Sequence, residues 1–277
     1  MSTSQPLDLL RWYVAMGADE AIAEEPIDRL AAATAATRAD APASRATGPA
    51  DLAQTNAATR SPPVIRATAA ETPSAAVATA KRLAEAATTL AELAAAVANF
   101  DGCALKRTAT NTVFADGVAD APLMVIGEAP GADEDRLGRP FVGRSGQLLD
   151  RMLGAIDYDR RRNAYITNVL FWRPPGNRKP TPDEIACCLP FVWRHIALLA
   201  PRAVMLSGGT ATSALLGRVD GITKLRGRWF ELAVPGLDHP VPALATYHPS
   251  FLLRAPARKG EAWRDLLALQ SKLKDGQ

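Results

Sequence analysis

The chain has 277 residues, which suits one or two domains, and 48% of them are hydrophobic. It has no run of about 18 uninterrupted apolar residues, which argues against a membrane-spanning helix. Three cysteines are too few for a disulfide framework and the amino terminus lacks a signal-peptide pattern, so we expect a cytoplasmic protein. Residues 1–99 carry 8 Lys+Arg and 11 Asp+Glu, a net charge of −3. Because the whole chain has a net charge of +3, residues 100–277 have a net charge of +6. The basic part suits a polyanionic partner without requiring one.

The first 99 residues divide into three segments. Residues 7–22 place four apolar side chains on one helical face, which predicts an N-terminal helical segment within residues 1–30. Residues 31–74 are rich in Ala, Thr and Pro and lack large apolar side chains, which predicts a disordered linker. The Ala-rich segment Ser74–Phe100 predicts one continuous helix that leads into the main domain, residues 75–277.

Apolar runs alternate with helical patterns from Leu105 onward. Four runs are typical of strands buried on both faces of a parallel sheet: Leu123–Glu128, Ala164–Leu170, Ala203–Gly208 and Val241–Tyr247. Helical patterns lie between and after them: Gly146–Ile156, Thr181–Leu199, Thr210–Gly217 and Glu261–Lys274. The alternation predicts right-handed βαβ units and an α/β fold. In such sheets the functional site lies beyond the carboxyl ends of the strands.

Four loops follow these strands. The first, Gly127–Gly146, contains Phe141 and is rich in glycine, which lets a backbone approach a ligand closely. Asn168 lies at the end of a buried strand, where its amide needs hydrogen-bond partners. The Gly-rich turn Ser207–Ala211 leads into a helix N-terminus, which suits phosphate, and His248 directly follows the last strand. Each of these features alone could have a purely structural role. All four, however, follow the carboxyl ends of strands in one sheet, which favours a functional site.

The sequence lacks several familiar catalytic patterns, namely GxSxG, GxGxxG, HExxH and the Walker motif. What remains is an amide that can read a base edge, an aromatic ring for stacking, a histidine, several acids and basic surroundings. A base-flipping enzyme needs these groups.

Three stretches carry a resemblance to a known family: GEAPGADEDRLGRPFVGRSGQLLDRML, YITNVLFWRPPGNRKPTPDEI and YHPSFLLR. Together they resemble the family 4 uracil-DNA glycosylases, the iron–sulfur type of bacteria and archaea, over about Phe100–Leu273. The resemblance implies a three-layer α/β/α sandwich with a four-stranded parallel sheet. It implies hydrolysis of the N-glycosidic bond of deoxyuridine in DNA, which starts base excision repair, by a catalytic domain over residues 75–277. We expect a monomer associated with the nucleoid.

The resemblance also implies roles for single residues. Phe141 would stack on the flipped uracil, Asn168 would bond its amide edge, and His248 would donate to its O2 atom as negative charge develops. Backbone groups of the GEAPG stretch, Gly127, Ala129 and Gly131, would line the uracil pocket.

Ala129 stands where other uracil glycosylase families place a water-activating aspartate. We therefore expect Glu134 to position the water, with Glu128 and Asp133 as weaker candidates. The alternative is that Glu134 only braces its loop.

Contacts with DNA are expected around the flipped nucleotide. Leu252 or Leu253 would enter the gap left by the base, with core packing as the alternative for either side chain. Phosphate contacts position a strand without reading its sequence. They are expected from Arg144, Ser145, Gly208, Gly209, Ser250 and Arg254.

The family's four cysteine ligands for a [4Fe–4S] cluster are incomplete here. Phe100 and Trp172 occupy two ligand positions, which leaves Cys103 and Cys188. Cys187 points about 100° away from Cys188 around a helix, so we expect it to be a poor replacement for a missing ligand. Because such a cluster normally requires four thiolates, we expect no cluster, with the two aromatic rings filling its space.

Two alternatives to catalysis remain. One is a uracil-DNA binding protein without turnover; a related group traps the base covalently through a histidine in an inserted loop after the Asn strand. The corresponding stretch here, FWRPPGNRKPTPDE, contains no histidine, which favours turnover. The other is a catalytically inactive DNA-binding module. The N-terminal segment is a candidate contact for another repair or replication protein, or an intramolecular cap.

Overall fold

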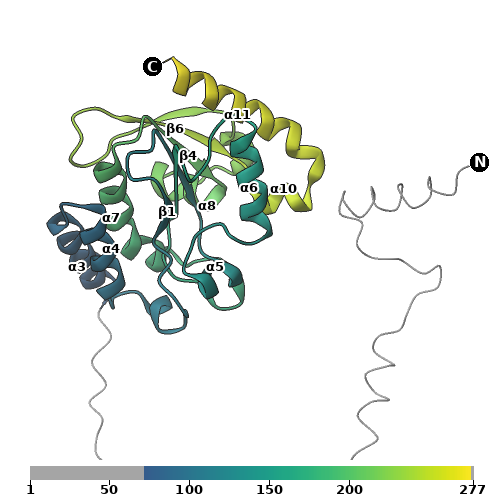
Figure 1. The fold of residues 1–277 in the computed structure, drawn as a ribbon. Coiled ribbons are helices and arrows are strands. Elements are labelled where there is room, and N and C mark those ends of the chain that lie inside the picture. Colours follow the sequence, from purple (N-terminus) through teal and green to yellow (C-terminus); the bar gives the residue numbers. More distant parts are fainter. Residues whose placement is uncertain (1–71, 276–277) are drawn as a thin grey trace, which may run out of the picture. The chain divides into compact units, whose positions relative to one another are not determined.

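The computed structural model describes residues 72–275, which lie within one compact unit, Arg66–Gln277 (Figure 1). The predicted N-terminal helical segment, and the predicted linker up to residue 71, lie outside the described residues. None of the described helices is long and apolar enough to cross a membrane.

A six-stranded mixed sheet runs through this unit in the order β1-β3-β2-β4-β6-β5. Its strands are β1 (Ala115–Gly117), β2 (Leu123–Gly127), β3 (Ala164–Asn168), β4 (Ala203–Ser207), β5 (Trp229–Leu232) and β6 (Val241–Thr246). The four predicted strands form its parallel centre, β3-β2-β4-β6. In register, Gly127 of β2 pairs with Asn168 of β3, so two of the predicted loops start side by side.

The expectation of a four-stranded parallel sheet is therefore incomplete. Antiparallel strands β1 and β5 extend the sheet beyond β3 and β6. β1 has three residues, none of them buried, and only one residue of β5 is buried. β1, with the sequence ADG, has no apolar run, whereas β5, with the sequence WFEL, is apolar but only partly covered. Each of the two strands lies at an edge of the sheet.

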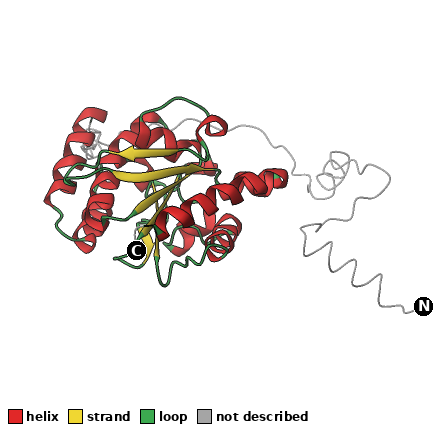
Figure 2. Cartoon of the chain, turned by 90° about the horizontal axis from the view of Figure 1, so that it is seen from above, coloured by secondary structure: helices red, strands yellow, loops and turns green. Residues whose placement is uncertain are grey.

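Helices cover both faces of the sheet, which gives three layers (Figures 1 and 2). They are α3 (Pro73–Ala86), α4 (Leu90–Asn99), α5 (Ala132–Leu137), α6 (Arg144–Gly154), α7 (Pro182–Leu199), α8 (Gly209–Leu216), α9 (Ile222–Leu225), α10 (Pro249–Arg254) and α11 (Lys259–Lys274). Three short 3-10 helices are η1 (Ala104–Arg107), η2 (Pro175–Asn177) and η3 (Pro256–Arg258).

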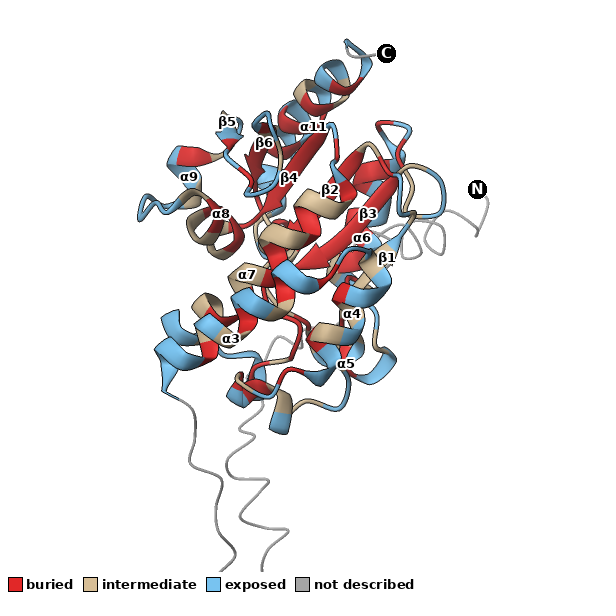
Figure 3. Ribbon diagram, turned by 90° about the vertical axis from the view of Figure 1, so that its left-hand side faces the viewer, coloured by how far each residue is buried: buried red, intermediate tan, exposed pale blue. Residues whose placement is uncertain are grey.

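Alternate residues of the central strands enter two separate cores. Met124 and Ile126 of β2 pack with α3, α4, α7 and α8, whereas Leu123 and Val125 pack with α6 and α11. Successive side chains of a strand point to opposite faces, so a sheet covered on both sides needs apolar residues at every position. All five residues of β2, β3 and β4 are buried (Figure 3).

The prediction of one continuous helix over Ser74–Phe100 is wrong. The chain forms α3 and α4 with a break at residues 87–89, where Thr89 becomes the N-cap of α4. The Thr89 hydroxyl accepts the N–H of Glu92 at 3.1 Å, and the Glu92 carboxylate accepts the N–H of Thr88 at 2.7 Å. Threonine followed three residues later by glutamate is a helix-start signal that high alanine content concealed.

Candidate active site

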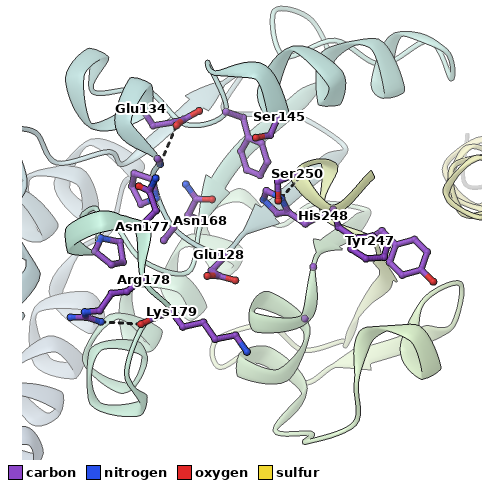
Figure 4. A pocket seen from close by; sticks show the side chains of 18 of the residues that line it. Glu128, Glu134, Ser145, Asn168, Asn177, Arg178, Lys179, Tyr247, His248 and Ser250 are labelled. Carbon is purple, nitrogen blue, oxygen red and sulfur yellow. Dashed lines mark hydrogen bonds between the residues drawn. The ribbon is translucent and has the colours of Figure 1, made fainter. Parts of the chain in front are cut away.

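A pocket of about 540 Å³ opens at the carboxyl ends of the central strands (Figure 4). Its size is typical of small-molecule sites. Most of the predicted site residues line it: Glu128, Ala129, Gly131, Glu134, Phe141, Ser145, Asn168, Gly208, Gly209, His248, Ser250 and Arg254. Gly127 does not line the pocket itself but lies next to the side chains of Asn168 and Phe141, which do. Arg144, the first residue of α6, is exposed. Sequence reasoning thus located the site through the strand ends.

Asn168 ends β3 with its side chain buried, and its Oδ1 atom has no hydrogen-bond partner in the described structure. A buried acceptor without a partner costs about 1–3 kcal/mol, so its retention points to a ligand that supplies the missing donor. Gly127 makes room for this amide, because a Cβ atom there would lie 2.4 Å from Asn168 Oδ1 and 2.5 Å from the Phe141 ring.

Phe141 is held in an uncommon backbone conformation, with φ of 54°. Arg160, largely buried, donates to the Phe141 carbonyl at 2.8 Å and is itself bound by the carboxylates of Asp116 and Asp150. A Cβ atom on Gly146 would lie 1.8 Å from the same carbonyl oxygen, so only glycine fits there. The surrounding structure therefore fixes the Phe141 ring, whose centroid is 5.4 Å from that of His248.

His248 directly follows β6 and caps α10. Its Nδ1 accepts the backbone N–H of Ser250 at 3.1 Å. A backbone N–H can only donate, so the neutral ring carries its proton on Nε2. Burial lowers the pKa of His248 to about 4, with a further lowering from Arg254 and an opposing effect of Glu134. At pH 7 the side chain is a neutral Nε2–H donor in the pocket wall.

The two pocket acids have different surroundings. Glu134 accepts the backbone N–H groups of Gly131 at 3.0 Å, Val142 at 2.8 Å and Gly143 at 2.9 Å. Glu128 accepts one hydrogen bond on its carboxylate among the described residues, from the Thr210 hydroxyl at 2.6 Å. Glu134 therefore braces the loop that carries Phe141, and Glu128 keeps more free acceptor capacity.

Sequence reasoning missed the contribution of the RPPGNRKP loop to this pocket. Pro174, Asn177, Arg178 and Lys179 line it. Arg178 is held by a bidentate pair with Glu184, at 2.9 and 2.6 Å, so the loop has a fixed geometry. These basic residues lie in the loop that connects the Asn168 strand to the next helix, and this position was the signal that could have found them.

Leu252 and Leu253, the two candidates for entering the gap left by the flipped base, differ in burial. Leu252 is buried in the core with α6 and α11, which assigns it to packing. Leu253 is half-buried, and Phe251 rather than either leucine lines the pocket.

Comparison with known proteins gives consistent matches. The family model of the uracil DNA glycosylase superfamily matches residues 114–267. A type-4 uracil-DNA glycosylase of Pyrobaculum aerophilum is 38% identical over 174 residues, which cover 61% of this chain and 87% of that protein. The chain belongs to the type-4 branch of the uracil-DNA glycosylase superfamily.

Two further type-4 uracil-DNA glycosylases are similar to this one. That of Thermotoga maritima is 41% identical over 153 residues, covering 55% of this chain and 77% of its own. That of Archaeoglobus fulgidus is 38% identical over 163 residues, covering 57% and 80%.

The positions that the family resemblance assigns to the ligands of a [4Fe–4S] cluster do not supply four thiolates in this glycosylase. Phe100 and Trp172, both buried, pack with ring centroids 6.5 Å apart, and Phe191 meets Phe100 at 5.2 Å. The expected apolar filling by the two aromatic replacements is confirmed. Two of these four assigned positions, Phe100 and Trp172, carry no sulfur, so the residues present do not fit such a cluster, which normally takes four thiolates.

The expectation that Cys187 is badly placed to join the other two cysteines is wrong. The sulfur atoms of Cys103, Cys187 and Cys188 all lie within 4.8 Å of one another. Neighbouring helix positions differ by about 100° in direction, yet both can reach a third sulfur that lies between them. The thiols of Cys187 and Cys188 hold the pKa of Cys103 below its ordinary value, while the pKa values of Cys187 and Cys188 are raised.

Proposed function

We propose that this glycosylase flips deoxyuridine out of DNA and hydrolyses the bond between uracil and deoxyribose. The observation that supports this most directly is the buried, unpartnered Oδ1 of Asn168, in a pocket that Phe141 and His248 also line. The type-4 uracil-DNA glycosylases similar to the chain carry the same activity in their names. The product is an abasic site, so the reaction starts base excision repair.

Asn168 would select uracil through complementary hydrogen bonds. Its Oδ1 accepts the uracil N3–H, and its amide group donates to O4. Cytosine presents an acceptor at N3 and a donor at N4, which reverses both requirements. Phe141, clamped by Arg160, would supply the stacking surface for the flipped base.

His248 would stabilise the leaving group. As the glycosidic bond breaks, negative charge develops on the base, and the Nε2–H of His248 donates to O2. The ring is already oriented by Ser250, so this electrostatic stabilisation needs no rearrangement during the reaction.

A water molecule must then attack the cationic sugar. We assign its positioning to Glu128, because the carboxylate of Glu134 already accepts three backbone N–H groups. This shifts the role from Glu134, which the sequence favoured, to Glu128, one of the two weaker candidates. Glu134 would act by holding the Phe141 loop in place.

Glutamine substitutions separate these two roles. Glu128→Gln is expected to lower kcat about 10²-fold or more with little change in Tm, since it removes the charge that orients the water. Glu134→Gln turns an amide donor toward a backbone N–H, so we expect a lower Tm as well as weaker binding of uracil-containing DNA. Single-turnover kinetics, DNA affinity and thermal unfolding measured on both variants decide the assignment. If Glu134→Gln is stable and binds DNA normally but has lost turnover, Glu134 rather than Glu128 positions the water.

The basic rim of the pocket would hold the DNA backbone. Arg178, Lys179 and Arg254 line the pocket, and the Gly208–Gly209 turn and Ser145 lie at helix starts. Arg144 is exposed beside Ser145 and is a further phosphate contact in this proposal. We place the enzyme as a monomer on the nucleoid in the cytoplasm, with the N-terminal segment as a contact for another repair or replication protein.

Excision from a defined oligonucleotide tests the proposed function. We expect the purified full chain to convert a single deoxyuridine to an abasic site that alkali cleaves, and to leave a matched thymine oligonucleotide intact. A complex that survives denaturation, or tight binding without cleavage, would support the alternative of a uracil-DNA binding protein without turnover. Absence of both cleavage and uracil-dependent binding would overturn both.

A further inference from the structure

Three buried thiols form a group beside the start of α7, outside the residues that line the pocket. Cys103 precedes η1, and Cys187 and Cys188 lie in α7. Their sulfur atoms lie within 4.8 Å of one another, and all three side chains are at least 96% buried. They are the three cysteines that the whole sequence contains. The group therefore accounts for all the thiol chemistry of the chain.

The spacing of the sulfur atoms suits a single ion. With zinc–sulfur bonds of about 2.3 Å, the ligands of a tetrahedral or trigonal site lie about 3.8–4.0 Å apart. Sulfur atoms that already lie within 4.8 Å of one another reach this spacing by small side-chain rotations. Three thiols are too few for an iron–sulfur cluster, which normally takes four, and the positions that the resemblance assigns to the other ligands hold the buried rings of Phe100 and Trp172. The group therefore suits one ion rather than a cluster.

The surroundings select a soft cation. The three thiols belong to the same apolar core as Phe100, Trp172 and Phe191. Hard, strongly hydrated cations are disfavoured in such surroundings, whereas thiolate ligands select Cu⁺ and Zn²⁺. Glu184 lies in the first turn of the helix that holds two of the thiols. Its carboxylate fixes Arg178 at the pocket wall, and its carbonyl accepts the Cys187 thiol at 3.3 Å.

We propose that Cys103, Cys187 and Cys188 bind one thiophilic closed-shell cation, Zn²⁺ or Cu⁺, as a structural site. Binding replaces the thiol protons, which are released to solvent. The cation joins the segment before η1 to α7 and so stabilises the folded chain. The site is independent of the proposed uracil excision.

Metal titration of the full chain tests this proposal. Reduced, chelator-treated protein is titrated with Zn²⁺, and anaerobically with Cu⁺, each against a competing chelator. We expect one equivalent of at least one ion with Kd below about 1 μM, and a Tm that rises with its concentration. Cys103→Ser and Cys188→Ser are expected to weaken binding more than about 100-fold, since even outer-shell changes cost 10–100-fold. His239→Ala, at an exposed histidine outside the group, serves as the matched control.

Several outcomes would overturn the proposal. One is wild-type protein with three free thiols that binds neither ion in this range, and another is binding that survives in both serine variants. If the serine variants fail to fold, failure of both ions to protect the wild-type thiols from alkylation contradicts the site equally. Iron and inorganic sulfide at cluster stoichiometry in the purified protein would also contradict it. None of these measurements uses DNA, so a result that contradicts the metal site does not bear on the proposed uracil excision.

Discussion

Replacing His248 with alanine is expected to lower kcat for uracil excision about 10²–10³-fold, the usual effect of removing one donor to a developing anion. The reason lies in the geometry: Ser250 fixes Nδ1 as an acceptor, so Nε2–H is the donor available to the leaving base. KM is expected to change little, because the hydrogen bond strengthens only as the glycosidic bond breaks. Single-turnover excision of a deoxyuridine oligonucleotide measures this effect.

His239→Ala is a suitable control, because this histidine is exposed and outside the pocket. It should leave excision unchanged. A His248→Ala enzyme with nearly normal kcat would remove His248 from the mechanism.

The depressed pKa of His248 gives a second readout. Its value of about 4 in the folded chain lies below the ordinary value of 6.5, so the unfolded chain binds more protons between these pH values. The stability contributed by this group is fully present above pH 6.5 and is lost as the pH falls toward 4. We expect the free energy of unfolding of His248→Ala to fall less steeply over this range than that of the wild type. Urea titrations at several pH values measure the difference.

Replacing Asn168 with aspartate is expected to lower kcat/KM for uracil about 10²-fold or more. Aspartate keeps an acceptor for N3–H but loses the donor to O4, and a carboxylate oxygen then faces a carbonyl oxygen. A mismatched hydrogen-bonding edge costs about 1–3 kcal/mol in recognition, and burial of the charge adds to this. Because the N4 amino group of cytosine can donate to a carboxylate, the ratio of uracil to cytosine excision should also fall. Competition assays with both oligonucleotides report that ratio.

Asn168→Ala separates recognition from folding. It removes a buried acceptor that has no partner among the described residues, so the loss of an unsatisfied group offsets part of the cost of the cavity. We expect near-normal thermal unfolding together with lost excision. An alanine variant that still excises uracil and rejects cytosine would show that recognition lies elsewhere in the pocket.

Local pattern located the central strands, and with them most of the pocket. Apolar runs such as LMVIG mark strands that are buried on both faces, and their last residues are adjacent because the strands are parallel. Gly127, Asn168 and His248 could therefore be assigned to one edge of the sheet from the sequence alone. The edge strands escaped this reasoning, because β1 has no buried residue and takes its pairing from β3, far along the chain.

The sequence by itself determined the parallel centre of the sheet and placed the candidate site residues at the strand ends, since both depend on residue type at a local spacing. Only the tertiary structure decided how the Phe141 loop is held, which residues complete the pocket, and where the cysteines point. Arg160 reaches the Phe141 carbonyl across 19 residues, and the Trp172 ring binds the Thr112 hydroxyl across 60. Cys103 joins Cys187 and Cys188 only because the fold brings the segment before η1 to α7. Such contacts depend on the path of the whole chain, which no local pattern of side chains contains.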